Sequence, residues 1–219
     1  MKLVIVDYGS GNLRSVENAM RAATTFAQRP HEIVISSDPV EVGKADYLVL
    51  PGVGAFADCR AGLDSIDGMI DAINHLAWDL RRPFLGICVG MQLMAEAGEE
   101  GGQTTLGLGW ITGQITALDP WQDNIRLKVP HMGWNQWIAK SSNPAAALFS
   151  GLSNDSRAYF LHGYHLTGGT EDQLLATTDY GEHIVAAVAR DNMIGLQFHP
   201  EKSQHVGQAI LANWLRLMS

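Results

Sequence analysis

The residues that could do chemistry begin with a cysteine between two glycines, in Gly86-Ile87-Cys88-Val89-Gly90. A short apolar run precedes Cys88 and we predict a helix over Val89–Ala97, so the order is strand, sharp turn, helix. In the serine version of this elbow, small residues on both sides let the chain turn tightly and hold the nucleophile above the sheet edge. A cysteine there would be exposed, would face the positive end of the helix and would have the Val89 N–H as an oxyanion donor. A buried structural cysteine is the alternative.

A base for such a nucleophile is available near the C-terminus, in Phe198-His199-Pro200-Glu201. In an extended segment positions i and i+2 point to the same side, and Pro200 fixes the backbone between them. Glu201 can therefore orient the His199 imidazole, while the other ring nitrogen serves Cys88 as general base. The three residues predict a Cys-His-Glu triad. Taken singly, His199 could be a strand-end histidine and Glu201 a first-turn acid beside a helix dipole.

A glycine-rich turn, Pro51-Gly52-Val53-Gly54-Ala55-Phe56-Ala57, could present backbone N–H groups to an anion. It would supply the second half of an oxyanion hole, with Val89 N–H as the first. The turn also matches G-x-G-x-x-A, the dinucleotide fingerprint, which requires an acidic residue about twenty positions on, at the end of the next strand. Here that strand ends at Cys88, and the first turn, Gly9-Ser10-Gly11-Asn12-Leu13-Arg14, lacks the third glycine. The dinucleotide interpretation is therefore weak.

Alternating strands and helices must position these turns. Apolar runs predict strands at Leu3–Val6, Glu32–Ile35, Tyr47–Leu50, 83–88 and Ile194–Phe198. They predict helices over 13–23, 58–80 (as one long helix or a broken one) and Gln204–Leu217, the last with Ser203 as N-cap. Shorter runs predict antiparallel strands at Gly109–Leu118, Arg126–Val129, Ala158–Leu166, Leu174–Thr178 and Ile184–Ala189. We expect an α/β fold with a doubly wound, mainly parallel central sheet and antiparallel additions. The chemistry should lie at the carboxyl ends of the parallel strands.

Composition limits the classes of protein. With 219 residues, 46% of them apolar, the chain can bury one full core, and we expect a single domain over 1–219. A net charge of −8 without a Lys/Arg run argues against nucleic acid or an anionic membrane as partner. Two cysteines, no signal peptide and no membrane-length apolar run predict a cytoplasmic protein. His162 and His165 give no complete ligand set, so we expect no metal, and no cofactor either.

Taken together, Gly86–Gln92, Pro51–Gly54 and His199–Glu201 resemble the class I (triad-type) glutamine amidotransferase family. Asp7–Leu13, Pro130–Asn135 and Gln197–Ser203 are similar to one branch of it, the glutaminase subunits of imidazole glycerol phosphate synthase, and this likeness covers essentially the whole chain. The resemblance implies that the chain hydrolyses glutamine to glutamate and ammonia. It also implies a heterodimer with a (β/α)₈-barrel cyclase, which uses the ammonia to form imidazole glycerol phosphate and AICAR in histidine biosynthesis.

The resemblance also implies roles for single residues. Cys88 would be the nucleophile, His199 the base and acid, and Glu201 the orienting carboxylate. The substrate and oxyanion positions would be Gly52, Val53, Gly54, Val89, Gln92, Gly163 and Tyr164, and the positions near the partner Asn12, Trp134, Tyr159 and Lys202. Relatives commonly have Ser or Thr where this chain has Gly163, so a hydroxyl near bound glutamine is lost while the backbone donor and acceptor remain.

Three other functions stay open. A stand-alone cysteine hydrolase or γ-glutamyl peptidase would be active without a partner. A paralogous glutaminase would feed ammonia to a sugar-modifying enzyme. A non-enzymatic interaction module is disfavoured because Cys88, His199 and Glu201 are all present. For the leading interpretation, the family implies little activity until the cyclase is bound with its ligand. Activation would then occur through rotation of the Gly52-Val53 peptide toward the oxyanion, which the glycines on both sides of Val53 permit.

Overall fold

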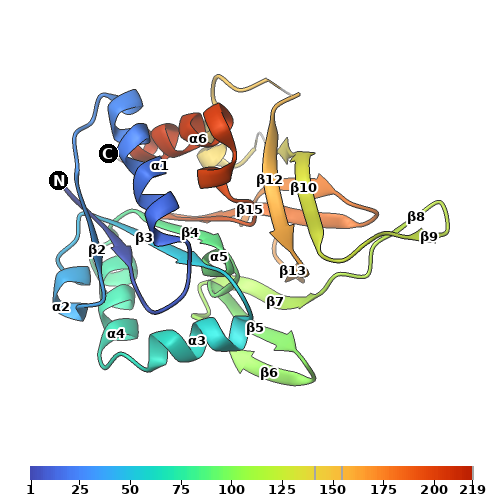
Figure 1. The fold of residues 1–219 in the computed structure, drawn as a ribbon, viewed down its shortest axis with the longest axis horizontal. Helices are drawn as coiled ribbons and strands as arrows, with labels where there is room; N and C mark the ends of the chain where they lie inside the picture. The colour runs from blue at the N-terminus through green and yellow to red at the C-terminus, as the bar shows by residue number, and fades with distance from the viewer. Residues whose placement is uncertain (141, 154, 219) are drawn as a thin grey trace.

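A large sheet forms the centre of the molecule. The computed structural model describes residues 1–140, 142–153 and 155–218. The strands of this sheet are β1 (Lys2–Val6), β2 (Glu32–Ser36), β3 (Tyr47–Gly52), β4 (Phe84–Cys88), β11 (Ile138–Ala139), β14 (Leu174–Asp179), β15 (His183–Arg190) and β16 (Met193–Leu196). Their order is β11-β14-β15-β16-β4-β3-β1-β2, and the part from β16 to β2 is parallel (Figure 1). The remaining strands, β15, β14 and β11, pair antiparallel.

Helices cover both faces of this sheet. They are α1 (Leu13–Ala27), α2 (Pro39–Val42), α3 (Phe56–Asp64), α4 (Met69–Asn74) with a π-helical turn at His75–Asp79, α5 (Val89–Gln92) and α6 (Gln204–Leu217), with 3₁₀ turns η2 (Pro144–Phe149) and η3 (Pro200–Lys202). Figure 1 shows α1 and α6 together on one face and α3 and α4 on the other. Strands β3 and β4 are buried along their whole length between these layers, as their continuous apolar runs predict.

The second half of the chain adds smaller sheets beside the central one. Their strands are β5 (Ala95–Glu100), β6 (Gln103–Leu106), β7 (Ile111–Ala117), β8 (Trp121–Gln122), β9 (Ile125–Arg126), β10 (His131–Gln136), β12 (Arg157–His162) and β13 (Tyr164–Thr167). They form a four-stranded sheet in the order β13-β7-β5-β6 and the pairs β10-β12 and β8-β9. Most of these pairings are antiparallel, so the predicted fold class, a mainly parallel sheet with antiparallel additions, is confirmed.

Besides Ala158–Leu166, where the expected single strand is divided at Gly163 into β12 and β13, which belong to different sheets, three local predictions are wrong. The helix expected over Val89–Ala97 ends at Gln92, because the backbone of Ala95–Glu100 pairs with β6 and β7 and this pairing overrides helical propensity. The strand expected at Arg126–Val129 ends at Arg126, since Pro130 has no N–H and the Tyr180 hydroxyl donates to the Lys128 carbonyl. The broken helix over 58–80 is present, with its break at Gly68 (φ 78°).

The third concerns the segment after β16, expected to be extended. His199 is followed by the 3₁₀ turn η3, so the turn rather than strand alternation places Glu201 beside it. Ser203 does precede α6 as predicted, but its hydroxyl donates to the His199 carbonyl and accepts from Tyr159 N–H instead of capping the helix. The hydroxyl thus ties η3 to β12.

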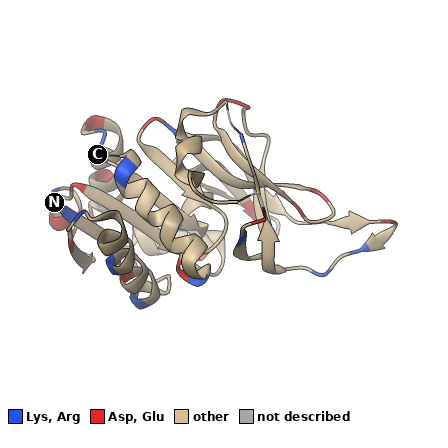
Figure 2. Ribbon diagram, turned by 90° about the horizontal axis from the view of Figure 1, so that it is seen from above, with Lys and Arg blue, Asp and Glu red and all other residues tan. Residues whose placement is uncertain are grey.

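Charged side chains are spread over the molecule. Figure 2 shows Lys and Arg interspersed with Asp and Glu, without a face given over to basic residues. Among the described residues, no helix combines the length and the apolar character needed to cross a membrane.

Candidate active site around Cys88

The chain turns sharply at Cys88, between β4 and α5. Cys88 has φ 53° and ψ −110°, a conformation that L-residues rarely adopt. The neighbouring glycines make the turn possible: a Cβ on Gly86 would lie 2.6 Å from the Gly90 carbonyl oxygen, and one on Gly90 would overlap the carbonyl oxygen of Leu50. The predicted strand, tight turn and helix are therefore present, with a helix of a single turn.

The Cys88 side chain is buried, which corrects the expectation of an exposed thiol. Only 3% of the residue is exposed, because β12 covers it: Sγ lies 3.8 Å from the Leu161 carbonyl oxygen. Sγ still faces a cavity of about 120 Å³, whose wall includes His199. The cavity also gathers the predicted substrate and oxyanion residues Val53, Gly54, Val89, Gln92, Gly163 and Tyr164. The turns after β3, β4 and β16 thus meet at one edge of the sheet.

His199 and Glu201 form a buried pair in this wall. His199 Nδ1 lies 2.8 Å from Glu201 Oε1, and the two side chains are 2% and 3% exposed. The main chain of His199 is fixed by its N–H, which donates to the Tyr159 carbonyl at 2.8 Å. Since Nδ1 faces the carboxylate, Nε2 is the ring nitrogen available to Cys88, which lines the same cavity.

The charge state of His199 follows from these neighbours. Burial alone would lower its pKa, but hydrogen bonds to Cys88 and Glu201, together with the negative charges of these two groups, raise the pKa to about 9. At neutral pH the imidazole therefore carries a proton. A cation beside a cysteine favours the thiolate form of that cysteine.

The predicted oxyanion donors differ in availability. Val89 opens α5, so its N–H has no acceptor inside the helix. Val53 N–H instead donates to Ser10 Oγ at 3.2 Å, and Ser10 Oγ donates back to the Val53 carbonyl at 2.7 Å. The buried Cys59 thiol donates to the same carbonyl at 3.4 Å. Ser10 and Cys59 thus hold the main chain at Val53 in place, with its N–H engaged outside the cavity wall.

Gln92 is held in the wall by two hydrogen bonds from its side-chain nitrogen. Nε2 donates to the Tyr164 carbonyl at 3.0 Å and to Gln197 Oε1 at 3.1 Å. Its oxygen end is therefore the end left for a ligand. Gly163 has open space: a Cβ built there would have only Val129 Cγ1 near it, at 3.6 Å.

A carboxylate that the motifs did not identify, Glu100, also lines the cavity. One of its oxygens accepts from Phe56 N–H at 2.8 Å, at the start of α3. A carboxylate in this wall can bind an ammonium group. Glu100 is the last residue of β5. The sequence predicted a helix up to Ala97 instead of this strand, so the position of Glu100 in the cavity could not be predicted without knowing how β5 pairs.

His162 belongs to a chain of neutral imidazoles rather than to the acid–base pair. Its Nδ1 donates to the Tyr164 carbonyl at 2.9 Å, and its Nε2 lies 3.1 Å from His131 Nδ1. Burial lowers the pKa of His131 to about 4, and burial and the neighbouring His131 lower the pKa of His162 to about 3. Both rings stay uncharged at neutral pH and serve to order the wall.

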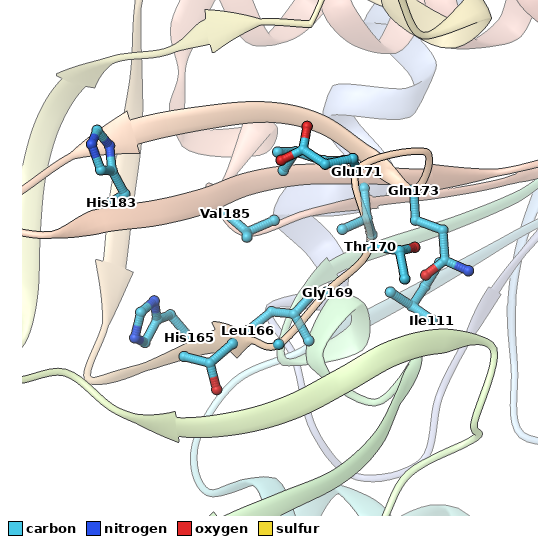
Figure 3. A pocket seen from close by; sticks show the side chains of 13 residues that line it. Ile111, His165, Leu166, Gly169, Thr170, Glu171, Gln173, His183 and Val185 are labelled. Atoms are coloured by element: carbon cyan, nitrogen blue, oxygen red, sulfur yellow. The ribbon is translucent and has the colours of Figure 1, made fainter.

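A second cavity of about 300 Å³ lies apart from Cys88, between β13 and the strands β14 and β15 (Figure 3). Leu166 and Val185 give it apolar walls, and His165, His183 and Gln173 add polar groups. None of the predicted site residues lines it. Its buried histidine, His165, has a pKa lowered by burial, an effect that the nearby charge of Glu182 reduces.

Three of the residues predicted to lie near a partner form one cluster. Trp134 on β10 faces Tyr159 on β12, with ring centroids 5.9 Å apart, and Lys202 Nζ lies 5.7 Å from the Tyr159 ring centroid. Trp134 is 44% exposed. Asn12 lies separately, exposed at the start of α1, where its side chain accepts from Ser15 N–H.

Comparisons with known proteins identify the family of the chain. The sequence model of the glutamine amidotransferase class-I family matches residues 4–218. The imidazole glycerol phosphate synthase subunit HisH of Rhodopseudomonas palustris is 49% identical over 216 residues, and that of Brucella suis 48% identical over 219 residues, each match covering 99% of both chains. Among solved structures, a glutamine amidotransferase with 15% sequence identity covers 98% of both chains with a TM-score of 0.69 and shares the fold.

Proposed function

The chain belongs to the class I glutamine amidotransferases and, within them, to the glutaminase subunits of imidazole glycerol phosphate synthase, and we propose that Cys88, His199 and Glu201 are its catalytic residues. One observation carries this assignment. Cys88 and His199 line the same cavity, and His199 Nδ1 lies 2.8 Å from the buried carboxylate of Glu201. A nucleophile, a base and an orienting acid in that order are what acyl transfer requires.

The first half of the reaction uses the charged pair. The Cys88 thiolate attacks the side-chain carbonyl carbon of glutamine, a C–S bond forms and the carbonyl electron pair moves to oxygen. When the carbonyl re-forms, the C–N bond breaks, and the departing nitrogen takes the proton of the His199 imidazolium and leaves as ammonia. A γ-glutamyl thioester remains on Cys88. The pKa of His199, raised to about 9, supports this order because the proton is already on the imidazole.

The second half releases glutamate. His199, now neutral, takes a proton from water, and the resulting hydroxide equivalent attacks the thioester carbonyl. The C–S bond breaks, glutamate leaves and the thiolate–imidazolium pair is restored. Glu201 keeps the imidazole in position through both halves.

Substrate recognition is assigned to the remaining wall of the cavity. Glu100 would bind the α-ammonium group of glutamine, because it is the carboxylate of that wall. The oxygen end of Gln92 and the backbone at Gly163 and Tyr164 would contact the rest of the substrate. Val89 N–H would bind the oxyanion, together with Val53 N–H once the peptide between Gly52 and Val53 has rotated.

Ser10 supports the idea that this rotation is a switch. Its hydroxyl holds both the N–H and the carbonyl of Val53, and φ of 99° at Gly54 shows that the following residue already uses glycine's freedom. The Ser10→Ala variant should therefore show several-fold more glutaminase activity without a partner. A Ser15→Ala variant, at a half-buried serine in the first turn of α1, is the matched control. Equal basal rates in both variants would argue against a latch at Ser10.

The partner that receives the ammonia is proposed to be the (β/α)₈-barrel cyclase, in a heterodimer. The cluster of Trp134, Tyr159 and Lys202, in which Trp134 is exposed and the other two are half-buried, would form one part of the contact, and Asn12 another. Ammonia released into bulk water would be protonated and lost, so a closed path into the partner fits the chemistry. Within this proposal the chain is one domain over 1–219 and is cytoplasmic, where a reducing environment suits its free cysteines, Cys59 and Cys88.

The test is glutamate release from glutamine by the purified chain, first alone, then with the cyclase, then with the cyclase and its nucleotide ligand. We expect activity that depends on the liganded cyclase and that disappears in Cys88→Ala. Strong activity of the chain alone would favour the stand-alone hydrolase. Absence of activity in every condition would favour the paralogue with a sugar-modifying partner, or the interaction module.

A further inference from the structure

Gln197 lies behind Cys88 and contacts the reacting atom. The residue follows β16 and is 0% exposed, and its main chain is fixed by an N–H that donates to the Ala186 carbonyl at 2.9 Å. Its side-chain Nε2 donates to Cys88 Sγ at 3.8 Å. Because the main chain is anchored in this way, a substitution at Gln197 should change the side-chain amide and leave the backbone in place.

The orientation of this amide is fixed by its neighbours. The Tyr164 carbonyl can only accept, so the nitrogen end of Gln92 must face it. The same nitrogen donates to Gln197 Oε1 at 3.1 Å, which makes the oxygen end of Gln197 the accepting end. The nitrogen end of Gln197 is thereby directed at the sulfur. The Tyr164 carbonyl thus orients the Gln92 amide, and Gln92 orients the Gln197 amide so that its N–H points at Cys88.

We propose that Gln197 is a catalytic residue that stabilises the Cys88 thiolate through its side-chain N–H, and that Gln92 positions it. The proposal rests on the nucleophilic role of Cys88 assigned above. An anionic sulfur in a buried site needs hydrogen-bond donors. The Leu161 carbonyl, also 3.8 Å from Sγ, acts in the opposite direction, because it can accept only from the protonated thiol. Gln197 offsets this preference.

Other groups also act on the sulfur, and a test must leave them unchanged. The titratable groups that interact with Cys88 or share its cavity are Tyr8, Cys59, Glu100, His162 and His199, and Glu201 contacts His199. None of them is altered by a substitution at Gln197. The effect of the variant on the thiolate is therefore a measure of the amide donor.

The experiment measures alkylation of Cys88 by iodoacetamide between pH 5 and 10, without glutamine or cyclase. The thiolate attacks the CH₂ carbon, a C–S bond forms and iodide leaves, so the rate reports the thiolate fraction. Mass spectrometry of the peptides separates Cys88 from Cys59. In Gln197→Met, which keeps the length of the side chain and removes the donor, the midpoint of the pH profile should move up by roughly one unit, about tenfold less thiolate below it.

Two variants complete the design. Gln197→Glu keeps the acceptor for Gln92 and replaces the donor by an acceptor, so its upward shift should be larger, and it covers the case in which Gln197→Met does not fold. Gln173→Met makes the same change at a buried glutamine of the second cavity, whose Oε1 accepts from Thr112 N–H, and should leave the profile unchanged. Wild-type profiles in the folded Gln197 variants, or equal shifts in Gln173→Met, would overturn the proposal.

The alkylation profile can be measured whether or not the chain releases glutamate. A shifted profile in a chain that releases no glutamate even with the liganded cyclase would support the donor role of Gln197 toward the thiolate and count against the proposed glutaminase function. Normal glutamate release with an unshifted profile would support the proposed glutaminase function and reject the role of Gln197. Gln92→Met should move the midpoint in the same direction by a smaller amount, because Gln197 keeps its donor but loses its orientation.

Discussion

Two buried histidines in this molecule each face a glutamate, and the environment holds them in opposite charge states. His199 and His165 are 2% and 4% exposed, so burial opposes the charged imidazole in both. Yet the pKa of His199 is raised to about 9, while that of His165 is lowered. Burial therefore does not decide which histidine carries a proton.

The contacts of the two pairs explain the difference. Glu201 is buried and lies 2.8 Å from His199, whereas Glu182 is 30% exposed and lies 3.6 Å from His165. A Glu182 oxygen also accepts from the Asp119 N–H, and His165 Nδ1 has no hydrogen-bond partner among the described residues. His199 also has Cys88 beside it, and this second neighbour raises the pKa of the imidazole further. A charged imidazole is stabilised where a buried carboxylate contacts it and a cysteine lies beside it, and a single, partly solvated carboxylate does not suffice.

The largest difference between the two pairs is expected when each glutamate is neutralised in turn. Glu201→Gln should lower kcat for glutamine hydrolysis by about 10³-fold or more, because the imidazole loses its orienting carboxylate. Glu182→Gln makes the same change beside the other histidine and should stay within about twofold of wild type. Both are measured as glutamate release with the cyclase and its ligand. Equal losses in the two variants would mean that the second cavity takes part in the reaction.

The two histidines should also titrate far apart in NMR spectra of the folded chain. We expect the His199 ring signals to move near pH 9 and those of His165 below pH 6.5, with assignment by single His→Gln variants. Removing a neighbouring charge should lower the first midpoint, in Glu201→Gln and in Cys88→Ala alike. A His199 midpoint that is unaffected by both substitutions would remove the explanation given for the difference.

The parts of the active site that the sequence predicts are those whose residues lie close together along the chain. Cys88 with its glycines, and His199 with Glu201, are local patterns, and the parallel sheet follows from the alternating apolar runs. The contact of Gln197 with Cys88 and the place of Glu100 in the cavity depend on how strands far apart in sequence pair. Even within the local motif, the exposure of Cys88 was not predictable, because β12 covers it from a distant part of the chain.

Protein stability should depend on pH with opposite sign in the two regions. For His199 the folded pKa, about 9, is above the unfolded value of 6.5, so its contribution is complete below pH 6.5 and is lost as the pH rises to about 9; its size is about 3 kcal/mol. For His165 the folded pKa lies below the unfolded one, so its contribution is present above pH 6.5 and is lost as the pH falls.

Urea unfolding of variants separates these contributions. Glu201→Gln should flatten the loss of unfolding free energy between pH 6.5 and 9. His165→Gln should flatten part of the loss on the acid side, where His131 and His162, with lowered pKa values, also contribute. A Glu201→Gln variant with the alkaline slope of wild type would contradict the assignment of that slope to His199.

The smallest effect is expected at Gly163, which joins the two regions. It lies between β12, which ends at His162 in the active site, and β13, which carries His165. A Cβ there meets only ordinary contact, with Val129 Cγ1 at 3.6 Å, so Gly163→Ser should fold normally.

A hydroxyl at this wall should lower the KM for glutamine by about 2- to 10-fold, the effect of one neutral hydrogen bond, with little change in kcat. Gly163→Ala adds the Cβ without the hydroxyl and should keep the wild-type KM. The His165 titration should stay unchanged in both variants, because the hydroxyl faces the Cys88 cavity rather than the second one. A lower KM in Gly163→Ala as well would assign the gain to filled space, and a displaced His165 midpoint would show that the two regions are coupled through this strand.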